Sequence, residues 1–132
     1  MKKSNLRTSK EKHVLVVDDD LDILRAVRVA LVSAGFEVSV AQDGVQGLAV
    51  VAAQKPDLVI LDMIMPKRSG LLVLERIRQG DLLLPVIAIT CSEMAQHQTY
   101  AELLGVADYI CKPFKLDRLL NSVSHLLALE TV

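Results

Sequence analysis

Apolar and polar positions follow two alternating patterns along the 132-residue chain. Three short runs, at 14–17, 58–61 and 85–89, are entirely apolar, which is typical of strands buried on both faces of a sheet, and two further runs, at 36–41 and 107–111, mix apolar and polar residues. The segments after these runs carry apolar residues every three or four positions, as amphipathic helices do. The pattern predicts five strands, at residues 14–17, 36–41, 58–61, 85–89 and 107–111.

Capping residues and helix breakers define the first two helices. Asp20 is the expected N-cap of the first helix, and Gly35 is expected to end it in the left-handed conformation. Asp43 is the expected N-cap of the second helix, which Pro56 stops. The residues expected to face the core are Leu24, Val27, Leu31 and Ala34 in the first helix and Val45, Leu48, Ala49 and Ala52 in the second.

The last three predicted helices differ in their apolar faces. Polar residues interrupt the segment 93–104, so we expect a weakly anchored helix that can shift. The third helix, which Gly80 ends, and the fifth, at 115–128, have continuous apolar faces. These faces consist of Leu71, Leu74, Ile77 and Arg78 in the third helix and Leu116, Leu119, Leu120, Val123 and Leu127 in the fifth.

Five successive strand–helix units predict an α/β fold with a doubly wound parallel sheet. Right-handed crossovers between parallel strands place helices on both faces of such a sheet. Periodicity alone leaves the order of the strands open. Since 52% of the residues are hydrophobic, we expect one core and a single domain at 12–129, with a flexible arm at 1–11 and no output domain.

Charge is distributed unevenly along the chain. Residues 1–12 carry five Lys or Arg and one Glu, whereas residues 13–132 carry ten basic and fifteen acidic groups. No aromatic or Gly-rich pattern accompanies the basic arm, so we expect a solvated tail rather than a direct nucleic-acid contact. The apolar stretches are too short for a membrane span or a signal core, which favours a cytoplasmic protein.

The two cysteines follow no metal-binding spacing. Cys91 and Cys111 each end an apolar run, and we expect both to be buried and inert. A redox role for the pair is the weaker alternative.

Polar residues stand at the carboxyl ends of four predicted strands. They are the pair Asp18 and Asp19, then Asp62, Thr90 and finally Lys112, which Pro113 follows. Ligands bind at the carboxyl ends of the strands in open parallel sheets. The sequence therefore predicts that these residues form one site.

The segments around these residues resemble the receiver domain of two-component response regulators, including stand-alone chemotaxis regulators. The matching segments are VLVVDDD at 14–20, LDMIMP at 61–66 with Gly70 beyond, PVIAIT at 85–90 and ADYICKPF at 107–114. The resemblance implies a flavodoxin-like fold with strand order 2-1-3-4-5. It also implies that a histidine kinase or a histidine phosphotransfer protein phosphorylates Asp62.

The resemblance assigns a role to each site residue. Asp19, Asp62 and the backbone carbonyl of Ile64 would bind Mg²⁺ directly and Asp18 through water, which suits a hard cation that prefers oxygen ligands. Lys112 would neutralise the phosphoryl group, and a cis peptide bond to Pro113 would orient it. Thr90 would donate its hydroxyl to a phosphoryl oxygen.

The same contacts suggest a switch. If Thr90 moves toward a phosphoryl oxygen, the ring of Tyr109 can occupy the space that it leaves. We expect phosphorylation to shift a two-state equilibrium of helix 93–104, strand 107–111 and helix 115–128. That shift would change the surface that a downstream protein target binds, and these helices could also support a homodimer.

Three features depart from the usual receiver pattern. Cys91 stands where the family usually has Ala or Gly, and it narrows access to the phosphoryl group. Lys67 and Arg68 make their loop unusually basic, although solvated loop charges are the simpler interpretation. Ile64 is apolar and cannot orient an attacking water, so we expect a long-lived phosphoryl group.

Other functions remain open at this stage. A flavodoxin-like FMN protein would need a Ser-, Thr- and Gly-rich loop where this chain has three Asp residues. A phosphatase with an Asp nucleophile usually has a second acid where Ile64 stands. A phosphorylation-independent interaction domain is the third alternative. In the preferred interpretation the chain is a phosphoacceptor that dephosphorylates itself, and it is not expected to be an enzyme.

Overall fold

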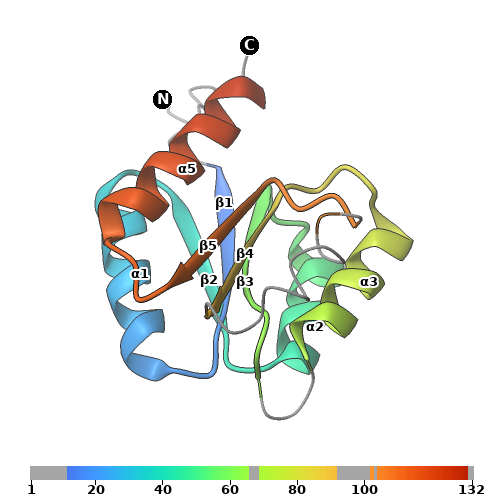
Figure 1. The fold of residues 1–132 in the computed structure, drawn as a ribbon. Coiled ribbons are helices and arrows are strands. Elements are labelled where there is room, and N and C mark those ends of the chain that lie inside the picture. Colours follow the sequence, from blue (N-terminus) through green and yellow to red (C-terminus); the bar gives the residue numbers. More distant parts are fainter. Residues whose placement is uncertain (1–11, 66–68, 92–101, 103, 131–132) are drawn as a thin grey trace.

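The computed structural model describes residues 12–65, 69–91, 102 and 104–130 (Figure 1). Apart from residues 102 and 104, the predicted helix 93–104 lies outside them, as do the basic arm at 1–11 and the pair Lys67 and Arg68. The strands are β1 (His13–Val17), β2 (Glu37–Ala41), β3 (Leu58–Asp62), β4 (Val86–Cys91) and β5 (Asp108–Lys112). The helices are α1 (Leu21–Ser33), α2 (Gly44–Gln54), α3 (Gly70–Gly80) and α5 (Leu116–Glu130).

The five strands form one parallel sheet in the order β2-β1-β3-β4-β5. Helices α1 and α5 cover one face of the sheet, and α2 and α3 cover the other (Figure 1). This arrangement confirms the doubly wound sheet that the periodicity predicts and the strand order that the resemblance implies. It also brings the carboxyl ends of β1 and β3 side by side at the middle of the sheet.

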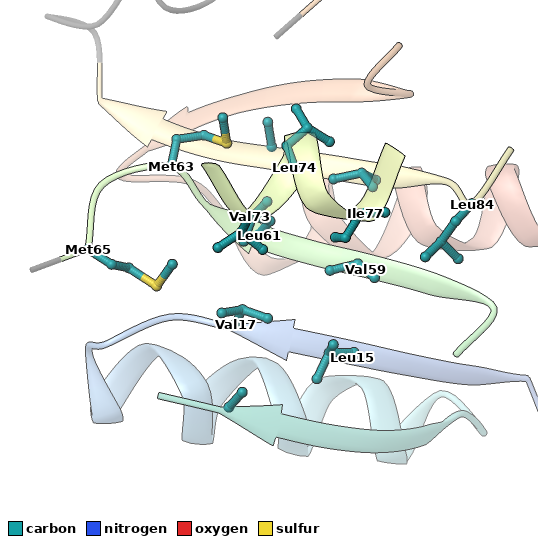
Figure 2. Close-up of a cluster of buried hydrophobic side chains, with 13 residues drawn as sticks. Leu15, Val17, Val59, Leu61, Met63, Met65, Val73, Leu74, Ile77 and Leu84 are labelled. Atoms are coloured by element: carbon teal, nitrogen blue, oxygen red, sulfur yellow. The ribbon is translucent and has the colours of Figure 1, made fainter. Parts of the chain in front are cut away.

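The continuous apolar runs supply two cores, one on each face of the sheet. Leu15 and Val17 of β1 belong to the core on the α2 and α3 side, whereas Val14 and Val16 belong to the core on the α1 and α5 side. Figure 2 shows the first core, in which strand residues such as Leu61 lie beneath the helix α3. Both faces of the central strands are therefore buried, which explains why their sequences do not alternate with polar residues.

The predicted helix ends are confirmed. The side chain of Asp20 accepts hydrogen bonds from the backbone N–H groups of residues 22 and 23, at 3.0 and 3.3 Å. Asp43 caps α2 by accepting from Gln46 N at 2.9 Å. Gly35 follows α1 with a φ of 102°, which is the left-handed conformation expected of it.

Leu48 packs against the core as predicted, but the other three residues of the predicted core face of α2 do not. Val45 is 57% exposed, and Ala49 and Ala52 are exposed as well, while Gly44 and Gly47 are buried. The cause is close packing on the sheet, because a Cβ at residue 47 would lie only 3.0 Å from a methyl group of Val17. The glycine side of α2 therefore faces β1, and Leu48 and Val51 are its apolar contacts with the core.

Three smaller predictions of burial are also wrong. Leu116, expected on the core face of the fifth helix, is 37% exposed in the first turn of α5. Ala34 is exposed because it is the C-cap of α1 rather than part of the helix face. Cys111 is exposed near the carboxyl end of β5, which is one of the two edge strands of the sheet. Among the described residues, none of the helices has the length and apolar character needed to cross a bilayer.

Candidate functional site

Two buried carboxylates face each other at the carboxyl ends of adjacent strands. Asp62 ends β3, and Asp18 directly follows β1; each is 3% exposed. The neighbouring Asp19 is exposed. One carboxylate oxygen from each of the three lies within 4.8 Å of the other two. The predicted acidic cluster is therefore assembled in the structure.

Backbone donors hold the two buried carboxylates in place. Asp20 N donates to Asp18 Oδ1 at 2.9 Å, and Ile64 N donates to Asp62 Oδ1 at 3.0 Å. Each bond spans two residues, so each carboxylate is fixed by the turn that follows its own strand. These bonds leave the Oδ2 atoms of both residues directed to the same neighbour, Lys112.

Gly70 allows the loop after β3 to fold back onto the site. Gly70 N donates to Met63 O at 3.0 Å. A Cβ at residue 70 would lie 2.3 Å from Met63 Cα and 2.6 Å from Asp62 O, closer than any side chain tolerates. The first turn of α3 thus packs directly on the backbone that carries Asp62, and this contact requires a glycine.

Lys112 is the cation of the site. It ends β5, and its Nζ lies 3.2 Å from Asp18 Oδ2 and 3.4 Å from Asp62 Oδ2. Burial lowers the pKa of Lys112, but the charges of Asp62 and Asp18 outweigh burial and raise this pKa above its ordinary value. The peptide bond to Pro113 is cis, as the resemblance implies.

The acidic groups outnumber the positive charge that stabilises them. Burial raises the pKa of Asp62 to about 7; the Ile64 hydrogen bond and Lys112 oppose this rise, and the charge of Asp18 adds to it. Three carboxylates thus cluster beside one lysine, which contacts two of them. This set of hard oxygen donors fits a divalent cation such as Mg²⁺, which would offset the remaining negative charge.

Thr90 and Tyr109, for which the resemblance predicts a switch, lie on the same face of the sheet. Thr90 is 1% exposed and lies near the end of β4, beyond the residue that pairs with Asp62. Tyr109 pairs with Ala88, two residues before Thr90, so both side chains belong to the same face of the sheet. Tyr109 is partly buried and packs against the core on that face.

Of the four residues that depart from the usual receiver pattern, the structure describes the side chain of Ile64 only. The side chain of Ile64 is 45% exposed at the turn after Asp62, where its position relative to a phosphoryl group remains a prediction. The basic pair Lys67 and Arg68 lies outside the described residues, and so does the side chain of Cys91.

Sequence reasoning gave no role to two groups that the structure makes prominent. Arg78 was expected on the apolar face of its helix, and it is indeed buried there, with four hydrogen bonds to backbone carbonyls. Asp108 binds Arg118 of α5. The position of Arg78 among the apolar residues of its helix indicates that it is buried. No spacing in the sequence indicates the ion pair of Asp108 with Arg118.

Comparison with known proteins identifies the family to which this chain belongs. The model of the response regulator receiver domain matches residues 14–124. The transcriptional regulatory protein DltR of Streptococcus agalactiae is 43% identical over 114 residues, which cover 83% of this chain and 49% of DltR. The response regulator MprA of Mycobacterium sp. (strain KMS) is 37% identical over 114 residues, covering 86% of this chain and 50% of MprA.

Solved structures agree with this assignment. A CheY-like receiver domain protein from Methanospirillum hungatei has a TM-score of 0.86 at 27% identity and covers 89% of this chain and 94% of its own. The chemotaxis protein CheY4 of Vibrio cholerae has a TM-score of 0.82 at 27% identity, and the match covers 87% of this chain and 98% of the CheY4 chain. The chain spans about half the length of the curated relatives that it matches. By sequence and by structure, this chain belongs to the family of response regulator receiver domains.

Proposed function

We propose that this receiver domain is a phosphorylation-activated switch that accepts a phosphoryl group on Asp62. The observation that carries the proposal is the contact of Lys112 Nζ with both Asp18 and Asp62 beside a third carboxylate. Receiver domains interact with histidine kinases and with downstream targets. The donor in this proposal is therefore the phosphohistidine of a sensor kinase or of a histidine phosphotransfer protein.

Asp62 acts as the nucleophile of the transfer. One of its carboxylate oxygens forms a bond to phosphorus while the bond from phosphorus to the donor's imidazole nitrogen breaks. The nitrogen keeps the electron pair of that bond, so no oxidant or further reactant is needed. The hydrogen bond from Ile64 N and the charge of Lys112 both favour the ionised carboxylate that the reaction requires.

Other residues neutralise the incoming charge. Receiver domains generally bind Mg²⁺, which here would be held by Asp19, Asp62 and the carbonyl of Ile64, with Asp18 acting through water. The bound cation supplies positive charge to the phosphoryl oxygens. Lys112 exchanges part of its contact with the carboxylates for a contact with a phosphoryl oxygen, and Thr90 donates its hydroxyl to another.

The response is a shift between two states. Thr90 moves toward the phosphoryl group, Tyr109 turns inward, and the surface formed by 93–104, β5 and α5 changes for a downstream protein. The alternative, an interaction domain that works without phosphorylation, gives no reason for the shared contact of Lys112 with two buried carboxylates. A phosphatase would need an acid at position 64, where the chain has an exposed isoleucine.

Incubation with a small phosphoryl donor tests the proposal. Acetyl phosphate with Mg²⁺ should add one phosphoryl group to the wild-type protein, as measured by intact mass, and none when EDTA replaces Mg²⁺. Asp62→Asn should remain unmodified, and Asp57→Asn, at the opposite end of β3, serves as the control that is modified normally. An unmodified wild type, or a modified Asp62→Asn, would contradict the proposal.

A further inference from the structure

Arg78 is a charged residue that is almost entirely buried. It lies in the last turn of α3 and is 8% exposed. Burial of a charged group is costly unless hydrogen bonds satisfy it. Every nitrogen of its guanidinium donates to a backbone carbonyl, and these hydrogen bonds offset the cost of burying the charge.

The four carbonyls belong to two separate turns. Nη1 donates to Asp81 O at 3.1 Å and to Leu84 O at 2.8 Å, both in the turn between α3 and β4. Nε donates to Leu104 O at 2.6 Å, and Nη2 donates to Gly105 O at 3.1 Å, both in the turn before β5. The residue thus joins the end of α3 to a turn 26 residues away in sequence.

The second turn leads directly into the strand of the switch. Gly105 has a φ of 77°, and its N–H donates to Glu102 O at 3.0 Å. Ala107 N then donates to Val86 O at 2.8 Å, which starts the pairing of β5 with β4. In Figure 1 this turn, drawn in orange, runs on the α3 side of the sheet into β5. Tyr109 follows four residues after Gly105.

Strand β5 is fixed at both ends and on one edge. It is an edge strand with β4 as its neighbour in the sheet. At its carboxyl end Lys112 contacts the acidic cluster, and at its amino end the turn 104–105 is bound to Arg78. Because the strand backbone is anchored in this way, a rearrangement that begins at Asp62 is directed to the side chain of Tyr109.

We infer that Arg78 is a positioning residue of the switch: by holding the turn 104–105, it makes a phosphoryl group at Asp62 act on Tyr109 instead of displacing the whole edge strand. The inference rests on the proposed function. A lysine at position 78 would keep the charge but not this role. Its single nitrogen cannot reach carbonyls of two turns at once, whereas the planar guanidinium presents donors in three directions.

The test compares Arg78→Lys with the wild type by NMR, using beryllofluoride with Mg²⁺ as a stable mimic of the phosphoryl group. Without the mimic, the amides of Gly105 and Ala107 should exchange about 10- to 100-fold faster in the variant, as expected from the loss of hydrogen bonds to a charged group. With the mimic, the amide shift changes at Tyr109 and Ile110 should fall by about half or more. Phosphorylation of Asp62 from acetyl phosphate should remain.

Leu31→Ala separates this role from a general loss of stability. Leu31 is fully buried in the core on the opposite face of the sheet, so the variant is destabilised without a change at Arg78. It should keep the full response of Tyr109. Full amide shift changes at Tyr109 in Arg78→Lys, or an equal loss of them in Leu31→Ala, would overturn this inference but leave the proposed function intact. A wild type that responds to neither reagent would contradict the proposed function, and the inference with it.

Discussion

At the scale of single residues, the site depends on one lysine placed between two buried acids. The side chain of Lys112 is 27% exposed, and those of Asp18 and Asp62 are 4% exposed. Coulombic attraction at these distances is strong because the carboxylates are shielded from water. We therefore expect Lys112 to stabilise the folded protein, in addition to the part that the proposed function gives it in phosphoryl transfer.

Replacing this lysine should destabilise the metal-free protein. We expect Lys112→Ala to lower the free energy of unfolding by about 1–3 kcal/mol in EDTA, less than for a fully buried pair because the lysine is partly exposed. Mg²⁺ should restore part of the loss, since it supplies positive charge to the same carboxylates. Urea unfolding measures both effects. Lys115→Ala, at an exposed position three residues on, should match the wild type; equal stability of both variants in EDTA would disprove the role of Lys112.

Ile64 should govern how long the phosphoryl group persists. Its side chain is 45% exposed beside the turn that carries Asp62, and it offers no polar atom to hold an attacking water. We expect Ile64→Asn to shorten the lifetime by about three- to tenfold, because an amide can orient water for hydrolysis. The decay of the phosphorylated mass after removal of the donor gives the lifetime. Leu72→Asn, at another half-exposed apolar position, should leave it unchanged; equal lifetimes for Ile64→Asn and the wild type would refute this assignment.

At the scale of elements, α3 packs on the strand end that carries Asp62, the proposed phosphoacceptor. Gly70→Ala should lower the free energy of unfolding by about 3 kcal/mol or more, because its Cβ would collide with backbone atoms that cannot move aside. Gly80→Ala, in the same helix, is the matched control, since nothing lies within 4 Å of its added Cβ. Thermal unfolding should separate the two variants clearly. A Gly70→Ala protein of wild-type stability would show that the close packing is not required.

A second contact joins β5 to α5. The guanidinium of Arg118 donates to Asp108 at 2.8 and 3.0 Å, and Ser122 Oγ donates to the same carboxylate at 2.6 Å. The Arg118 bonds contribute most to lowering the pKa of Asp108, to about 2; burial opposes them, and Ser122 and the backbone of Tyr109 assist. Since this pKa is lower in the folded state, the stabilisation is present above pH 4 and is lost as the pH falls toward 2.

The pH dependence of stability should reveal this contact. We expect Asp108→Asn to be less stable than the wild type by about 1 kcal/mol at pH 7, a value reduced by solvent because Arg118 is half-exposed. The difference should shrink steadily between pH 4 and pH 2. Urea titrations at several pH values test this, with Asp117→Asn at an exposed position as control. A difference that stays constant down to pH 2 would contradict the assignment.

The elements also show how far hydrophobic periodicity predicts the fold. It placed all five described strands and the four described helices, because burial on one or both faces fixes the spacing of apolar residues. It misplaced most of the core face of α2, where two glycines are buried while Val45, Ala49 and Ala52 are exposed. Close approach of a helix to Val17 depends on the absence of a side chain, which a hydrophobicity pattern does not record.

At the scale of the whole molecule, the strand order explains why distant residues form one site. Asp18, Asp62 and Lys112 follow or end β1, β3 and β5, and the parallel order brings all three to the same edge of the sheet. This convergence could be predicted from strand ends alone. The bonds of Arg78 to two turns could not, because they join backbone carbonyls, and carbonyls are the same in every sequence.

The most direct test of the central claim is to locate the phosphoryl group on the chain. Borohydride reduces an acyl phosphate to an alcohol, so it converts a phosphorylated aspartate into homoserine. After treatment with acetyl phosphate, Mg²⁺ and borohydride, peptide mass mapping should find homoserine at position 62, with Asp18 and Asp19 unchanged. Homoserine at position 18 or 19, or at none of the three, would contradict the assignment of Asp62 as the phosphoacceptor.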